Sequence, residues 1–137
     1  IEDTMAAAEQ DLEQLVADAF RRASWRVHRP RPADAHQPDL IVEGGGSKYV
    51  LAIKRSSEGR RDRVIPLLSQ AILEAQAFAR QFPEAVVPVA VVGAPHLPPA
   101  VVDAVRRYAD RVAPQMVAGL VDAEGLRAFW GHGLEVL

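Results

Sequence analysis

The chain has 137 residues, of which 49% are apolar and 25% are charged, with a formal net charge of −2. This balance is typical of a soluble globular protein, and the length predicts one domain, 1–137, around one core. Because the sequence contains no cysteine, disulfides, a thiol nucleophile and thiolate metal sites are excluded.

Hydropathy gives no sign of a membrane protein. No apolar stretch approaches the length that crosses a bilayer, and the N-terminus lacks the basic-then-apolar order of a signal peptide. We therefore expect a cytoplasmic protein without a membrane partner.

The first half of the chain predicts a helix followed by three strands. Apolar residues at helical spacing predict a helix over 5–23, and alternation predicts a short strand over 24–28 before a proline-rich stretch. Two β-rich runs, 39–43 and 48–55, flank Gly44-Gly45-Gly46-Ser47 and predict a hairpin.

The second half alternates between helices and strands. A helix is predicted over 64–82, with Pro66 suited to its first turn. The remaining patterns predict a buried strand, a helix, a core strand and a short helix, over 86–94, 97–113, 115–122 and 123–130. The order α-β-β-β-α-β-α-β-α predicts an α/β fold with a mixed central sheet flanked by helices.

A lysine ends the otherwise apolar strand of the hairpin. Side chains at i and i+2 share a face of a strand, so Ala52 and Lys54 point the same way. A lysine in a central strand needs a partner or a solvent-lined cleft, and Asp39 begins the adjacent strand. We predict an Asp39/Lys54 pair, and the alternative is a surface pair between Lys54 and Glu58.

The same residues resemble a family signature. Pro38-Asp39, the glycine turn and Ala52-Ile53-Lys54 are similar to the motif of the PD-(D/E)XK, or restriction-endonuclease-like, superfamily, with Ala52 at the usual glutamate position. The resemblance covers roughly residues 9–95, and the run LEQLVADAFRRASWRV is similar to the first helix and strand of the restriction and Holliday-junction-resolving branches. It implies an αβββαβ core with an additional C-terminal helix and strand.

The resemblance implies a metal-dependent nuclease that hydrolyses DNA phosphodiester bonds. Mg²⁺ or Mn²⁺ would be held by Asp39, a carboxylate at position 52 and the backbone carbonyl of Ile53. Lys54 would orient the attacking water or stabilise charge on the phosphate. The outer shell would contain Gln70 and Glu13, or Glu9 one turn before Glu13.

Arginines follow the lysine strand directly. In a nuclease of this family they would contact backbone phosphates, and the alternative is a solvated loop. The residues concerned are Arg55, Arg60, Arg61 and Arg63. They belong to a basic stretch, 21–63, that holds eleven Lys or Arg against five Asp or Glu. The expected partners are DNA, RNA as a second choice, and, by resemblance, a second copy of the chain.

Ala52 departs from the family pattern. Alanine offers no ligand, so the metal should bind weakly or not at all and the chain as written should be impaired. Three explanations stay open: an inactivating replacement of glutamate, a naturally non-catalytic module that binds nucleic acid or protein, or another acid in its place. The candidates for that acid are Glu43, Glu58 and Glu74. A further alternative is an unrelated small α/β domain.

Overall fold

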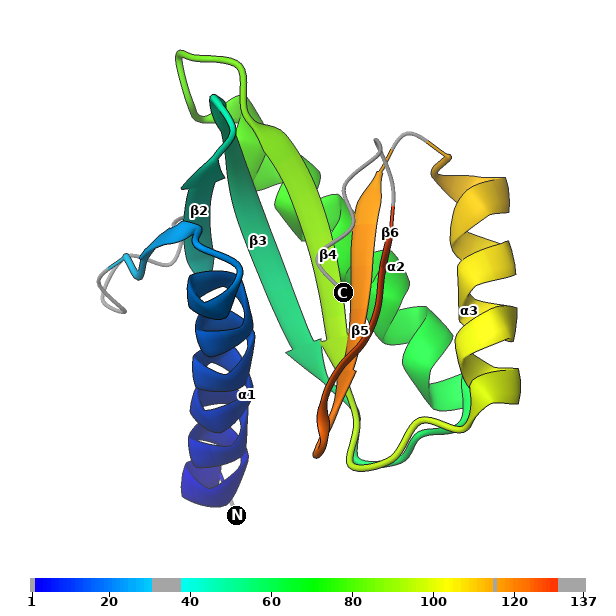
Figure 1. Ribbon diagram of the computed structural model, residues 1–137. Helices are drawn as coiled ribbons and strands as arrows, with labels where there is room; N and C mark the ends of the chain where they lie inside the picture. Colours follow the sequence, from blue (N-terminus) through cyan, green and yellow to red (C-terminus); the bar gives the residue numbers. More distant parts are fainter. Residues whose placement is uncertain (1, 31–37, 115, 131–137) are drawn as a thin grey trace.

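A six-stranded sheet forms the centre of the computed structural model, which describes residues 2–30, 38–114 and 116–130 (Figure 1). Side chains are described for 12–30, 38–114, 116–124 and 128. The elements are α1 Glu2–Arg22, β1 Arg26–His28, β2 Leu40–Gly44, β3 Ser47–Arg55, α2 Arg61–Arg80, β4 Val87–Gly93, α3 Pro99–Val112, β5 Val117–Asp122 and β6 Gly125–Trp130. The predicted α/β class with a mixed sheet and flanking helices is confirmed.

The strands lie in the sheet in chain order, from β1 to β6. β1, β2 and β3 pair antiparallel, β3–β4 and β4–β5 pair parallel, and β5–β6 pair antiparallel. The parallel pairs are joined through α2 and α3, and right-handed crossovers that proceed in one direction across a sheet place both helices on one face. None of the helices in the described part of the chain is both long and apolar enough to cross a membrane.

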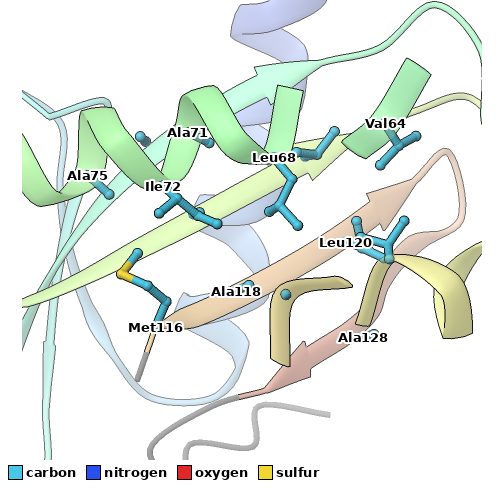
Figure 2. Packing of buried hydrophobic residues seen from close by; sticks show 14 of the residues in the cluster. Val64, Leu68, Ala71, Ile72, Ala75, Met116, Ala118, Leu120 and Ala128 are labelled. Carbon is cyan, nitrogen blue, oxygen red and sulfur yellow. The ribbon is translucent and has the colours of Figure 1, made fainter. Parts of the chain in front are cut away.

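The sheet separates two cores, one under α1 and one under α2 and α3. β4 contributes to both because its side chains alternate between the faces: Val89 and Val91 pack on the α1 side, whereas Ala90 and Val92 pack on the α2 side. Residues of the second core shown in Figure 2 include Val64, Leu68, Ile72, Met116 and Leu120. The fold therefore has three layers, with the sheet in the middle.

The predicted hairpin is confirmed, and its turn contains two glycines. Gly45 and Gly46 have φ angles of 58° and 78°, the left-handed conformation that a two-residue turn of the primed kind requires at both positions. Gly44 and Ser47 close the turn as a paired position of β2 and β3. The turn fixes the register that brings Leu40 opposite Leu51 and so positions the far end of the hairpin.

The predicted helix from Ala123 to Trp130 is wrong. Residues 125–130 form β6, which pairs with β5 from Asp122↔Gly125 to Ala118↔Trp130. The carboxylate of Asp122 accepts the Glu124 N–H at 2.9 Å, which favours a turn at this point. A six-residue segment is too short to show a decisive period, and the open edge of β5 offers a ladder of backbone hydrogen bonds that a short helix could not match.

α2 begins earlier than the apolar pattern predicted. The Val64 N–H already donates to the Arg60 carbonyl at 2.9 Å, so Pro66 lies in the second turn and not in the first. The first turn, Arg61-Asp62-Arg63, is exposed and therefore carries no apolar signal. Proline is tolerated here because it removes one hydrogen bond close to the helix start.

Candidate functional site

Asp39 is fixed at the end of the hairpin by two hydrogen bonds to β3. Its backbone N–H donates to the Leu51 carbonyl at 3.0 Å, and its Oδ2 accepts the Ile53 N–H at 2.7 Å. These two bonds place Asp39 beside residues 51–53 of β3, and so next to Ala52. The Asp39 carboxylate thus accepts the hydrogen bond of a β3 N–H group just before β2 begins.

Burial raises the pKa of Asp39 from its ordinary value of 3.8 to about 6. The hydrogen bond from Ile53 N–H lowers the pKa, the charge of Glu13 raises it, Lys54 lowers it and Glu74 raises it. These charges act on Asp39 because they lie near it. We call Asp39, Lys54, Glu74 and Glu13 the Asp39 site.

Lys54 pairs with Glu74 of α2, with Nζ 2.8 Å from Oε1. The predicted direct pair of Lys54 with Asp39 is not formed, and neither is the surface pair with Glu58, because Lys54 points from β3 toward α2. Its ammonium still lies close enough to Asp39 to lower that group's pKa. Lys54 therefore links the strand, the helix and the buried acid.

Ala52 has no exposed surface and belongs to the core under α2 and α3. It lies on the same face of β3 as Lys54, as the sequence predicted. The same core includes Leu68 and Ala71 of α2. The position that the family reserves for a carboxylate is thus filled by a small apolar side chain in a packed environment.

The donor set of the Asp39 site does not fit a resident Mg²⁺ or Mn²⁺. Among the described residues, no three acidic or histidine side chains gather closely enough to hold a metal ion. One oxygen of Asp39 is already engaged by Ile53 N–H, and Ala52 provides no oxygen. Hard divalent cations require several oxygen ligands in a regular arrangement, which these residues do not supply.

Glu13 lies in the Asp39 site but has a partner of its own. Its Oε2 accepts from Arg29 at 2.9 Å, and Arg29 also donates to Gln14 Oε1 at 3.0 Å. The side chain of Glu9, the other acid considered for this role, lies outside the described residues. Gln70 is exposed on α2, one turn before Glu74.

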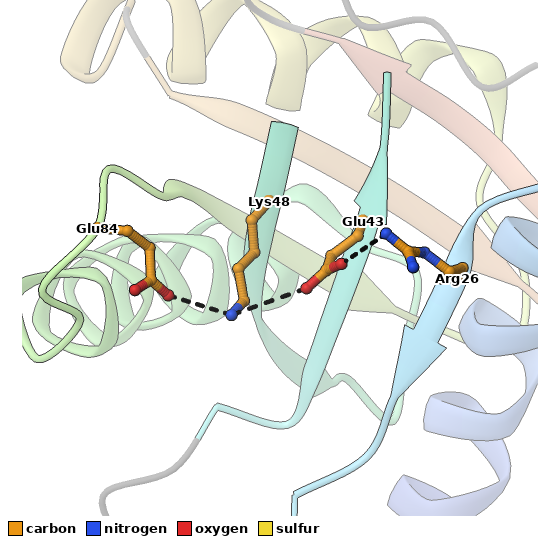
Figure 3. A network of polar contacts seen from close by, with 4 residues as sticks. All are labelled: Arg26, Glu43, Lys48 and Glu84. Atoms are coloured by element: carbon orange, nitrogen blue, oxygen red, sulfur yellow. Dashed lines mark hydrogen bonds and ion pairs between the residues drawn. The ribbon is translucent and has the colours of Figure 1, made fainter. Parts of the chain in front are cut away.

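Of the three acids considered as replacements at position 52, Glu74 lies at the site. Glu43 lies near the glycine turn, in a network with Arg26, Lys48 and Glu84 (Figure 3). Glu58 is in the loop before α2 and pairs with Arg60 at 2.8 Å. The explanations that use Glu43 or Glu58 are therefore not supported by the structure.

The four arginines predicted to contact phosphate do not form one cluster. Arg55 lines a cavity beside α1 with Leu12 and Leu15. Arg60 is occupied by Glu58 and Asp62. Arg61 lines a different cavity, between α2 and α3, and Arg63 is exposed on α2.

Sequence reasoning missed two groups that hydrogen-bond to members of the Asp39 site, the Arg29 side chain and the Ile53 N–H. Arg29 lies in the proline-broken stretch after β1, where no periodic pattern indicates which way a side chain points. The Ile53 N–H is a backbone group and leaves no trace in the residue type. The structure explains its involvement, because β2 begins at Leu40 and the Asp39 side chain supplies the acceptor for this β3 donor.

Comparisons with known proteins add no family to these observations. No family model matches the sequence, and a comparison with curated proteins found no match.

Proposed function

We propose that the chain is a nuclease-fold domain of the PD-(D/E)XK kind, directed at DNA phosphodiester bonds, whose hydrolytic site is incomplete at position 52. The observation that carries the proposal is the placement of Asp39, Ala52 and Lys54 together at one end of the hairpin. These are the three side chains that define the family motif. A chance pattern would not require an acid and a lysine from different strands to share this position.

The order and pairing of the elements support the same proposal. The segment from α1 to β4 has the order αβββαβ, with an antiparallel hairpin whose second strand pairs parallel with β4. α2 connects the lysine strand to β4 and carries Glu74 to Lys54. This order matches the one that the resemblance implies and supports the proposal.

The residues present hold and orient charge without completing a hydrolytic site. Asp39 is fixed by its backbone partner, and Lys54 is fixed by Glu74. A lysine held close to a buried acid can bind a phosphate oxygen. In this chain, however, the same lysine is already neutralised by Glu74, so we expect weak phosphate contact at this site and no appreciable cleavage.

The decisive experiment restores the acid. Ala52→Glu should give Mg²⁺-dependent cleavage of DNA, and adding Asp39→Ala should abolish it. Ala52→Gln is the matched control, because it adds the same volume at the same buried position without the charge. Circular dichroism and thermal melting establish that each variant folds, since a glutamate at a fully buried position costs stability.

The nuclease proposal fails if folded Ala52→Glu protein cleaves neither DNA nor RNA and calorimetry detects no Mg²⁺ or Mn²⁺ binding to it. Cleavage by Ala52→Gln to the same extent would also contradict the assigned role of the carboxylate.

A second candidate function is a non-catalytic module that keeps this fold to bind nucleic acid. The close packing of Ala52 in the core favours it, because the space for a carboxylate has been given to apolar contacts. This candidate predicts DNA binding in EDTA by the unaltered chain together with an inert Ala52→Glu variant. Absence of binding at low salt would argue against it.

A further inference from the structure

A groove between α2 and α3 gathers three arginines. It encloses about 320 Å³ and is lined by Arg61, Ile65, Ala104, Arg107, Tyr108 and Arg111. The two helices lie side by side on the same face of the sheet (Figure 1). The four α3 residues are spaced at i, i+3, i+4 and i+7, so they form one stripe along that helix. We call this cavity the α2–α3 groove.

The three guanidinium groups of the groove have no acidic partner among the described residues. No ion pair of that part of the chain includes Arg61, Arg107 or Arg111. The adjacent Arg60, in contrast, contacts both Glu58 and Asp62. Arginines that line one cavity without a direct ion-pair partner repel one another, and an anionic ligand relieves that repulsion.

Tyr108 gives the groove a fixed floor. Its hydroxyl and that of Ser69 on α2 are 2.7 Å apart, and the Arg111 guanidinium lies over its ring, 5.8 Å from the centroid. The hydrogen bond ties α3 to α2, while the ring and the guanidinium restrain each other. These contacts hold the groove in shape, and neither of them uses an N–H group of the groove arginines.

We infer that the α2–α3 groove binds the backbone phosphates of DNA. A guanidinium presents a planar fork of donors that matches phosphate oxygens, and three such forks around one cavity suit a run of phosphodiester groups. The inference deepens the proposed function and rests on it for the identity of the nucleic acid.

The groove and the Asp39 site are joined by α2. Arg61 and Glu74 are 13 residues apart on this helix, a distance of about 20 Å at 1.5 Å per residue. That length corresponds to about six base pairs of a duplex. The groove and the Asp39 site are therefore separated, along the axis of α2, by about the length of a short duplex segment.

The test is DNA binding by the unaltered chain and an Arg107→Gln/Arg111→Gln variant, in EDTA, with a short fluorescent duplex. Fluorescence anisotropy is measured over about 50 to 200 mM salt, the range in which phosphate contacts lose most of their affinity. Both arginines are exposed, so the variant should fold, which circular dichroism verifies. Arg21→Gln/Arg22→Gln is the matched control, because it removes two exposed charges from α1 in the opposite layer.

We expect the groove variant to bind with lower affinity and the slope of log affinity against log salt to fall in magnitude by about 2. The control should keep the affinity and slope of the unaltered chain. Arg107→Lys/Arg111→Lys should keep most of the slope, because the charges remain.

The inference is overturned if the groove variant binds as the unaltered chain does, if the unaltered chain does not bind the duplex at low salt, or if poly-glutamate competes as well as unlabelled duplex. Because the assay contains no metal and leaves position 52 alone, its result is separate from the cleavage test. If the Ala52→Glu variant is inert but DNA binding depends on Arg107 and Arg111, the nuclease proposal fails and the inference about the groove stands. If the Ala52→Glu variant cleaves DNA but binding is unchanged after loss of Arg107 and Arg111, the nuclease proposal stands and the inference about the groove fails.

Discussion

Lys54 of β3 and Glu74 of α2 form an ion pair of 2.8 Å beside the buried carboxyl of Asp39. The negative charge of Glu74 raises the pKa of Asp39. Glu74 also pairs with the Lys54 ammonium, which lowers the pKa of Asp39. Replacing Glu74 with glutamine removes the first effect and strengthens the second.

We therefore expect the pKa of Asp39 to fall below about 6 in Glu74→Gln. NMR titration of the Asp39 carboxyl carbon measures it directly. Glu84→Gln is the control, because Glu84 pairs with Lys48 near the glycine turn (Figure 3). An unchanged or higher pKa in Glu74→Gln would contradict the arrangement of charges described here.

The raised pKa of Asp39 also makes stability depend on pH. Between 3.8 and about 6, the folded chain binds a proton at Asp39 that the unfolded chain has released. The free energy of unfolding therefore falls as pH rises through this window, by about 1 to 3 kcal/mol. Partial exposure of the carboxyl to solvent favours the lower end of that range.

Asp39→Asn should remove this contribution while its amide oxygen still accepts the Ile53 N–H. Urea unfolding below and above the window should show a smaller loss of stability with pH for the variant than for the unaltered chain. Parallel pH profiles for the two proteins would show that Asp39 does not titrate as described.

The hairpin requires glycine at two positions for different reasons. A Cβ at Gly44 would lie 2.7 Å from Cε3 of Trp25, whose ring packs edge-on against Phe20 and Tyr49. Because this aromatic cluster holds the indole in place, Gly44→Ala should cost about 1 to 3 kcal/mol through overpacking.

Gly46 has open space around it, but its φ is 78°. Gly46→Ala should therefore cost about 1 to 2 kcal/mol through backbone strain alone, and Gly46→Asn less, because asparagine tolerates this conformation better. Urea denaturation of the three variants separates the two causes. Equal stability of Gly44→Ala and the unaltered chain would show that Trp25 can move.

Leu68 and Leu73 lie on the same helix and test the second core directly. Leu68 is fully buried, whereas Leu73 is 66% exposed. Leu68→Ala should lower the free energy of unfolding by about 2 to 5 kcal/mol, and Leu73→Ala should change it by less than about 0.5 kcal/mol. Chemical denaturation of both variants makes the comparison. Similar losses would place the buried face of α2 elsewhere.

The hairpin and the buried faces of the helices could be predicted because their signals are local. A glycine-rich turn between β-branched runs fixes strand pairing over a few residues, and apolar spacing selects which helix face packs inward. Val64, Leu68, Ala71 and Ile72 recur at helical spacing in the sequence, and all lie in the core.

The partner of Lys54 could not be decided in the same way. Asp39, Glu58 and Glu74 are all acids within plausible reach, and the choice depends on how α2 crosses β3, a relationship with no local signal. The wrong prediction of a helix over 123–130 has the same cause. Residues 125–130 form a strand because β5 presents an unpaired edge. Neither outcome can be obtained from the period of a short segment.

The groove arginines of α3 were overlooked for another reason. Arg107 and Arg111 are one turn apart, which is ordinary for the solvent face of a helix. They line a cavity together with Arg61, which lies more than forty positions earlier in the chain. Convergence from two helices is a property of packing, so it becomes visible with the tertiary structure.

α2 holds the second core with one face and carries Arg61 and Glu74 near its borders. The α2–α3 groove and the Asp39 site therefore share one structural support, the helix α2. A substitution in the buried face of α2 that shifts this helix would alter both sites at once.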